Sequence, residues 1–320
     1  MAVEAGKRKL GQATRDAFGD ALERLGASRP EVVTVDGDVG NSTRTEKFAK
    51  AFPDRAFNVG IAESNMVGVA AGLAAAGKTP VAASFACFLM CNAYDQIRMS
   101  VAFPGMNVKL VGSHAGISIG EDGPSQMGIE DVALACSLPG VVVIVPADAA
   151  STEAATAAML DHDGPVYLRL GRAKVPVIYE NGCENFEIGK AIRLRDGNDA
   201  TIIANGLMVS VALDAADELA AAGVNVRVLD MHTAKPIDED AIVAAAKETG
   251  RIVVAEEHLA AGGLGSLVAQ VVTRTRPVPM EYVNVGDRYA ESGDPEGLLR
   301  KYGLTSAAIV AAIRKLEDEG

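Results

Sequence analysis

Short runs of β-branched and other apolar residues alternate along this chain with longer, Ala-rich stretches of helical character. The runs that predict strands lie at 31–36, 79–84, 107–113, 141–146 and 165–170, and each is followed by a turn signal and a helical pattern. Strands that alternate with helices favour a parallel sheet covered by helices on its faces. The first half of the chain is therefore predicted to be an α/β domain.

A change of pattern after residue 172 divides the chain. Residues 173–186 contain a proline and an Asn-Gly pair and have no clear period, so we interpret them as a linker between a domain at 1–172 and a domain at 187–320. The second domain repeats the alternation, with strands predicted at 200–205, 225–230 and 251–257. The predicted fold class is thus α/β, with two domains that each contain a mainly parallel sheet flanked by helices.

One carboxylate stands out against this apolar background. Residues 58–77, NVGIAESNMVGVAAGLAAAG, predict a buried helix whose first turn contains Glu63. Glutamate is almost never fully buried without a partner, and apolar surroundings favour the protonated form of a carboxyl group, which can donate a hydrogen bond. An acid in a first turn also stabilises a helix through its dipole, and from position alone that explanation is the commoner one.

Composition and charge exclude several classes of partner. The 320 residues are 49% hydrophobic and carry a formal net charge of -12, which argues against nucleic acid or an anionic membrane as the main partner. The N-terminal residues lack the apolar core of a signal peptide, and the most apolar stretch, 66–83, is interrupted by Lys78 and Pro80. The four cysteines have no paired metal spacing, so we expect buried, reduced thiols in a cytoplasmic protein, without disulfide or zinc.

Polar loops after the predicted strands are the places to look for a ligand, because open α/β sheets bind ligands at the carboxyl ends of their strands. The loop at 36–43, DGDVGNST, suits close approach of a polar ligand, or equally a helix N-cap formed by Ser42 or Thr43. The loop at 112–128 is long and polar, which favours a functional role over a solvated lid. It contains His114, Glu121, Asp122, Ser125 and Gln126.

Two further candidates follow strands. Arg169 and Arg172, in LRLGR, could hold a phosphate or could close surface ion pairs. Phe85 and Phe88, in FACF, are either core residues on one helical face or a platform for a ligand ring.

Motifs from the whole chain now combine into one pattern. The strings are DGDVGNST, PDRAFNVGIAESNM, FACF with AYDQIRM, GSHAGISIGEDGPSQMGIEDVA, LRLGR, and VRVLDMHTAKPID with EEHLAAGGLGSLV. In this order and spacing, the chain from about Ala13 to near its end resembles the C-terminal half of a transketolase. That half comprises the pyrimidine-binding domain and the transketolase C-terminal domain.

The resemblance implies a thiamine diphosphate site. Glu63 matches the catalytic glutamate that binds N1′ of the aminopyrimidine, where a shared proton activates the cofactor. Phe88 and, less directly, Phe85 match the aromatic residues that stack on the pyrimidine, and Asp38 is expected among the cofactor-binding residues.

The resemblance also implies phosphorylated sugar substrates. Arg15, Ser42 and Arg172 match phosphate-contacting positions, and His114 matches a catalytic histidine that contacts the substrate. Asp122 matches a carboxylate that reads a substrate hydroxyl. Gln126 stands where many microbial enzymes have histidine and vertebrate-type enzymes have glutamine. The implied reaction is the transfer of a two-carbon ketol unit from a ketose phosphate to an aldose.

One part of the family pattern is missing. Full-length transketolases bind the diphosphate and its metal through a GDG motif followed by an asparagine, and the nearest strings here are DGD at 36–38 and GEDG at 120–123. The resemblance therefore implies a separate N-terminal subunit that holds Mg²⁺, with no metal ligand from this chain, and assembly into a heterotetramer.

Three alternatives remain open. The chain could be the β subunit of a 2-oxoacid dehydrogenase, a deoxyxylulose-phosphate synthase fragment, or a non-catalytic scaffold that keeps the fold. The loop at 120–127 and the arginines favour transketolase, and the intact Glu63, His114 and Asp122 argue against a scaffold. His258 is interpreted as an exposed loop residue, and the second domain is assigned to structure and assembly.

Overall fold

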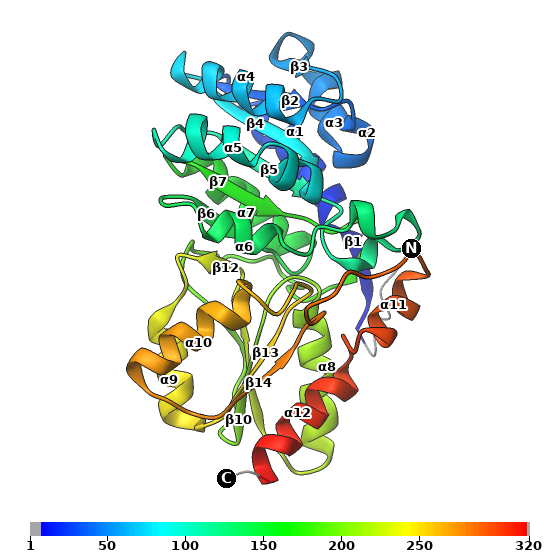
Figure 1. The fold of residues 1–320 in the computed structure, drawn as a ribbon, viewed down its shortest axis with the longest axis vertical. Coiled ribbons are helices and arrows are strands. Elements are labelled where there is room, and N and C mark those ends of the chain that lie inside the picture. Colours follow the sequence, from blue (N-terminus) through cyan, green and yellow to red (C-terminus); the bar gives the residue numbers. More distant parts are fainter. Residues whose placement is uncertain (1–7, 319–320) are drawn as a thin grey trace.

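The computed structural model of the protein describes residues 8–318. Two α/β units follow one another along the long axis of the molecule, and each is a sheet with helices on both faces (Figure 1). The predicted fold class is confirmed, because both sheets are mainly parallel.

The first sheet has seven strands in the order β12-β6-β7-β5-β4-β2-β3. Its strands are β2 (Val32–Asp36), β3 (Ala56–Asn58), β4 (Thr79–Phe85), β5 (Lys109–Ser113), β6 (Val142–Ile144), β7 (Val166–Arg169) and β12 (Thr233–Lys235). All neighbours pair in parallel except β12, which lies antiparallel to β6 at the edge. This edge strand comes from the second half of the chain.

Helices cover both faces of the first sheet. One face carries α4 (Glu63–Ala75), the π-helical segments η2 (Phe88–Asn92) and η3 (Ile97–Ala102), α5 (Tyr94–Gln96) and α6 (Asp131–Cys136); the other carries α1 (Thr14–Gly26), α3 (Thr45–Ala51) and α7 (Ala149–Asp161). The alternation of strand side chains fits this layering, since Val81 and Ala83 of β4 pack in one core and Ala82 packs in the other.

The second sheet has five strands in the order β14-β13-β10-β11-β9, of which only β9 is antiparallel to its neighbour. They are β9 (Ile192–Arg195), β10 (Ala200–Ala204), β11 (Val226–Asp230), β13 (Ile252–Ala255) and β14 (Met280–Val283). One face packs against α8 (Met208–Ala221) and α12 (Ser306–Asp318), and the other against α9 (Glu239–Thr249) and α10 (Leu264–Thr275). The remaining helix of this half, α11 (Pro295–Lys301), packs against the first half (Figure 1).

Short elements complete the connections. They are β1 (Leu10–Ala13), α2 (Gly40–Thr43), β8 (Lys174–Pro176) and the 3₁₀ turns η1 (Pro53–Arg55), η4 (Ile117–Asp122) and η5 (Pro124–Gln126). β1 and β8 form a two-stranded antiparallel ribbon, so part of the segment predicted to be an irregular linker is a strand. The boundaries at 172 and 187 stay a prediction.

Two expectations about burial are wrong. The helix α4 is only half buried, because Asn65, Gly68 and Gly72 lie on an exposed face. Of the four free thiols, Cys91 is exposed, whereas Cys87 and Cys183 are buried and Cys136 is half-buried. Among the described helices, none combines the length and the apolar character that crossing a membrane requires.

Candidate active site

The predicted site residues gather at the carboxyl ends of the parallel strands in the first sheet. Asp36 ends β2, Phe85 ends β4, Ser113 ends β5 and Arg169 ends β7. Since β2, β4, β5 and β7 are adjacent and parallel, the loops that follow them converge at one edge of the sheet.

Glu63 is the first residue of α4 and is buried, with 6% of its surface exposed. The hydroxyl of Ser84, on β4, donates a hydrogen bond to its Oε1 at 3.0 Å. The helix thus delivers an acid to the edge of the sheet, where a neighbouring strand fixes the orientation of its carboxyl group.

His114 follows β5 in a left-handed backbone conformation, with φ 57. Its Nε2 lies 2.9 Å from Nη1 of Arg15, and its Nδ1 lies 2.8 Å from Oγ of Ser113. A guanidinium can only donate, so Nε2 accepts and the proton resides on Nδ1, which donates to Ser113. Burial, followed by the charge of Arg15, lowers the pKa of His114 to about 3. The imidazole is therefore neutral at physiological pH.

Two phenyl rings stack beside this histidine. The ring of Phe85 lies parallel to that of His114 with centroids 3.8 Å apart, and parallel to that of Phe88 with centroids 5.3 Å apart. Phe85 ends a strand while Phe88 begins the π-helical segment, so the two do not share one face of a regular helix as the core interpretation required. Phe85 is buried and Phe88 is half-buried.

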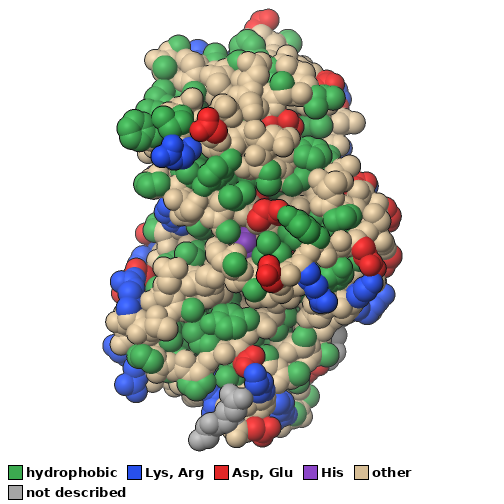
Figure 2. All heavy atoms as spheres, in the orientation of Figure 1, with side chains coloured by type: hydrophobic (Ala, Val, Ile, Leu, Met, Phe, Trp, Pro, Cys, Tyr) green, Lys and Arg blue, Asp and Glu red, His purple; other side chains and the backbone are tan. Residues whose placement is uncertain are grey.

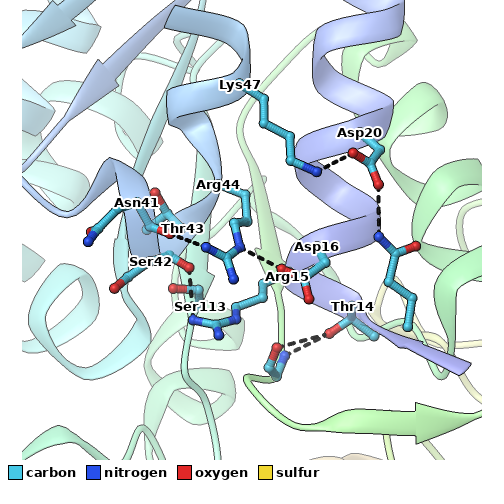
Figure 3. A network of polar contacts seen from close by, with 12 residues as sticks. Thr14, Arg15, Asp16, Asp20, Asn41, Ser42, Thr43, Arg44, Lys47 and Ser113 are labelled. Carbon is cyan, nitrogen blue, oxygen red and sulfur yellow. Dashed lines mark hydrogen bonds and ion pairs between the residues drawn. The ribbon is translucent and has the colours of Figure 1, made fainter. Parts of the chain in front are cut away.

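Arg15 links the first turn of α1 to the loop at 36–43 (Figure 3). Its Nη1 donates to the main-chain oxygen of Ser42 at 3.1 Å, and its Nε is buried without a partner among the described residues. Burial and the nearby charge of Arg44 lower the pKa of Arg15. Arg44 in turn donates to Asp16 at 2.5 Å, which fastens the same loop to α1. The unused donor of Arg15, close to the charge of Arg44, is a suitable place for an anion.

Arg172 and Asp122 form a second polar pair. Nη1 of Arg172 lies 3.6 Å from Oδ2 of Asp122 and donates to the main-chain oxygen of Ile119 at 2.9 Å. Gln126 ends the turn η5 in the same loop. These residues lie on the loop after β5 and on the loop after β7, the next strand in the sheet.

Asp38 lies in the loop between β2 and α2. It has a left-handed conformation, with φ 68, and its Oδ1 accepts a hydrogen bond from Asn58 at 2.8 Å. With Asp36 and Asn58 it lines a cavity of about 410 Å³ beside β2 and β3. Burial raises the pKa of Asp36, whose carboxyl accepts hydrogen bonds from Thr45 and from the Val39 amide.

The suggested phosphate role of Arg169 is wrong. This side chain is buried, its Nε donates to Asp131 at 2.8 Å, and its Nη2 donates to the main-chain oxygens of Gly128 and Glu257 at 2.9 Å. Its Nε and Nη2 donors are therefore used inside the protein, in place of the surface position that a phosphate contact requires.

His258 is also placed differently from the prediction, since it is 1% exposed. Its Nε2 accepts from the Ala133 amide at 3.3 Å, so its Nδ1 donates to the main-chain oxygen of Leu259. The residue connects the second half of the chain to α6.

Family comparison agrees with this geometry. Residues 11–177 match the transketolase pyrimidine binding domain, and residues 189–309 match the transketolase C-terminal domain. The chain belongs to the transketolase family.

Several transketolases are similar over nearly the whole chain. A 6-deoxy-6-sulfo-D-fructose transketolase subunit from Clostridium sp. (strain MSTE9) is 43% identical over 305 residues, which span 95% of this chain and 94% of that protein. Human transketolase is 40% identical over 308 residues, 95% of this chain but 49% of the human enzyme. A solved structure described as a split gene transketolase, inactive beta4 tetramer, has a TM-score of 0.87 at 46% identity and covers 96% of this chain and 98% of its own.

Sequence reasoning missed the serines that connect the predicted site residues. Ser113 Oγ lies 2.8 Å from His114 and donates to the main-chain oxygen of Ser84 at 3.5 Å, and Ser84 itself contacts Glu63. Both serines lie near the ends of strands that were predicted from sequence, and this position could have identified them as candidate site residues. Across residues 8–318 no cluster of three or more His, Cys, Asp or Glu side chains is arranged to hold a metal ion.

Proposed function

We propose that this chain is the C-terminal subunit of a two-chain transketolase, which transfers a two-carbon ketol unit between sugar phosphates. The observation that carries the proposal is the buried carboxyl group of Glu63, held at the edge of the sheet that also presents Arg15 and His114. The high identity to transketolase subunits supports it.

The residues fit thiamine diphosphate on two observations. Glu63 is a buried acid oriented by Ser84, and Phe88 is the half-buried end of a ring stack that suits a planar pyrimidine. When bound, this cofactor supplies the carbon nucleophile that cleavage of a ketose requires. In the proposal Glu63 holds a proton toward the aminopyrimidine, Phe85 and Phe88 contact its ring, and Asp38 lies in the adjoining wall of the site.

The sugar phosphate is proposed to bind between α1 and the loops after β5 and β7. The unpartnered Nε of Arg15 offers a donor for a phosphate oxygen, with Ser42 and Arg172 as the other phosphate contacts. Neutral His114 contacts the substrate through hydrogen bonds rather than charge. Asp122 reads a substrate hydroxyl, and Gln126 contacts the acceptor.

A second chain completes the proposed enzyme. The relative from Clostridium is called a transketolase subunit, and this chain spans about half the length of human transketolase. We propose that an N-terminal subunit binds Mg²⁺ and the diphosphate, and that the two kinds of chain assemble into a heterotetramer.

Reconstitution tests the function. The chain is mixed with a candidate N-terminal subunit, thiamine diphosphate and Mg²⁺, and cleavage of xylulose 5-phosphate is followed in the presence of an aldose phosphate. Activity only in the complete mixture is expected. Parallel reactions use 6-deoxy-6-sulfofructose, pyruvate and 2-oxoglutarate. Preference for the sulfonated sugar would correct the proposed substrate, and dependence on a 2-oxoacid would refute ketol transfer.

A further inference from the structure

The loop at 114–128, which carries His114 and Asp122, is fastened at its base within its own domain. The amide of Ala115 donates to the main-chain oxygen of Leu170 at 3.1 Å, and the amide of Gly116 donates to that of Gly128 at 2.7 Å. The turns η4 and η5 lie beyond this base. Within the first domain, Arg172 also donates to the main-chain oxygen of Ile119 in these turns. A long loop has many backbone conformations to lose, so each further contact helps to fix its shape.

The second half of the chain packs directly on these turns. Gly120 and Gly123 have left-handed φ values of 82 and 85. A Cβ at Gly120 would lie 2.7 Å from Pro295, and a Cβ at Gly123 would lie 2.4 Å from Oγ of Ser292. The tip of the loop is therefore seated against the segment that leads into α11.

Glu257 makes the polar contact between the two halves at the middle of the loop. It is 5% exposed, and its Oε1 accepts the backbone N–H of Ser118 at 2.6 Å. A Cβ at Gly116 would lie 2.1 Å from the carboxyl carbon of Glu257, so the carboxyl group lies directly on the loop backbone. Burial raises the pKa of Glu257 to about 7, against the opposing charge of Arg169.

The neighbouring Glu256 makes its hydrogen bonds within the second half of the chain. Its two oxygens accept from the amides of Leu264 and Gly265, where they stabilise the first turn of α10. Glu257 instead reaches into the other half of the molecule. At Ser118 the contact with the carboxyl group of Glu257 therefore ties the loop to the second half of the chain.

We propose that Glu257 is a positioning residue that sets the shape of the loop at 114–128 and, through His114 and Asp122, the affinity for the sugar phosphate. The affinity part rests on the proposed transketolase function. The second half of the chain then contributes to substrate recognition, beyond the structural role predicted from sequence.

Hydrogen exchange of the full chain, followed by mass spectrometry, tests the loop without any activity assay. Glu257→Ala is expected to speed exchange of peptides from the loop at least about tenfold, because the Ser118 amide loses its buried acceptor. Glu257→Gln keeps an acceptor oxygen of the same shape and should retain protection. Glu256→Ala is the matched control, with faster exchange expected at the start of α10 but not in the loop.

Unchanged loop exchange in Glu257→Ala, or an equal rise in both alanine variants, would overturn the proposal. If Glu257→Ala does not fold, Glu257→Met removes the acceptor while filling a similar volume, and the same comparison applies.

The reconstituted two-chain enzyme provides the second readout. Glu257→Ala should raise KM for the sugar phosphate about tenfold while kcat and thiamine diphosphate affinity stay within about twofold, and Glu257→Gln should restore KM. A fall in kcat with unchanged KM would overturn the affinity part. If the wild-type mixture has no transketolase activity, the proposed function fails, and hydrogen exchange alone decides the role of Glu257 in the loop.

Discussion

At the scale of single residues, the polarity of the site depends on a histidine that stays uncharged. His114 is held between Ser113, Arg15 and the ring of Phe85, and burial keeps its pKa near 3. Being neutral, it cannot supply the positive charge that a phosphate needs. That charge has to come from the neighbouring arginines.

The neutral state of His114 predicts a pH-dependent stability. The unfolded chain takes up this proton near pH 6.5 and the folded chain only near pH 3, so the stability contribution is complete above 6.5 and is lost as pH falls toward 3. At pH 5 the loss is about 2 kcal/mol. Urea unfolding of the wild type and of His114→Gln measures it, and the variant should lose less stability between pH 7.5 and pH 5. Parallel curves for the two proteins would contradict this account.

Glu63 should be required for catalysis but not for folding. Glu63→Gln keeps an oxygen that can accept from Ser84 but cannot exchange a proton with the cofactor, so ketol transfer in the reconstituted enzyme should fall by ~10²–10⁴-fold. Circular dichroism should show an unchanged fold. The exposed Glu23→Gln on α1 is the control and should keep full activity. A Glu63→Gln enzyme that works at near wild-type rate would refute the assignment.

At this scale, local motifs indicate which residues are candidates for the site, whereas contacts between distant segments determine what each side chain touches. Glu63 and His114 could be proposed from the sequence because their local motifs are specific, whereas Phe85 was matched less directly. The pairing of Arg169 with Asp131 and the burial of His258 against α6 depend on residues far apart in the chain, which no local pattern contains. For the same reason the contact between Glu257 and Ser118 could not be predicted from sequence.

At the scale of elements, the first turn of α1 has a defined task. The helix delivers Arg15 to the loop at 36–43, where Asp36 shapes the backbone by accepting from the Val39 amide and from Thr45. The carboxyl end of β2 and the start of α1 thus form one wall of the proposed phosphate site (Figure 3).

Removing the cation from α1 should weaken substrate binding selectively. Arg15→Gln loses charged hydrogen bonds, so KM for the sugar phosphate should rise about tenfold or more. Arg24→Gln, an exposed position on the same helix, is the control and should leave KM unchanged. Steady-state kinetics of the reconstituted enzyme distinguish the two, and similar KM values for both variants would argue against a phosphate at Arg15.

The strands that the sequence predicted are those with buried, β-branched runs. All eight are present, as β2, β4, β5, β6, β7, β10, β11 and β13. The strands that escaped prediction in residues 8–318 have only three or four residues, and several alternate poorly or are half exposed. The pairing of β12 with β6 joins distant segments, so local periodicity could not reveal it.

At the scale of the whole molecule, the outer face of α4 is exposed and could contact another chain. Gly68 and Gly72 are exposed, and a Cβ at either would meet no atom within 4 Å. Ile61, just before the helix, is 84% exposed, and Phe103 is 82% exposed. Figure 2 shows apolar side chains gathered on the side of the first domain where α4 and α5 lie. Such a surface is typical of a contact between subunits.

Enlarging this face should block assembly while leaving the fold intact. Gly68→Leu replaces a helix-weakening residue, so the thermal midpoint should stay the same or rise. Association with other subunits, measured by light scattering after size exclusion, should weaken because the added side chain prevents close approach. Ala221→Leu, an exposed position at the end of α8, is the control. Unchanged assembly of Gly68→Leu would place the contact elsewhere.

The antiparallel edge strand β12 has a consequence for how this protein can be divided. Because the first sheet takes its last strand from residues 233–235, a protease that cut near residue 182 would nick the backbone without releasing two pieces. A gene break at the same place would produce fragments that have to rebuild this sheet edge, together with contacts such as those of Glu257 with Ser118 and of His258 with Ala133. A division of the coding sequence is therefore far easier to accommodate outside these two domains than between them.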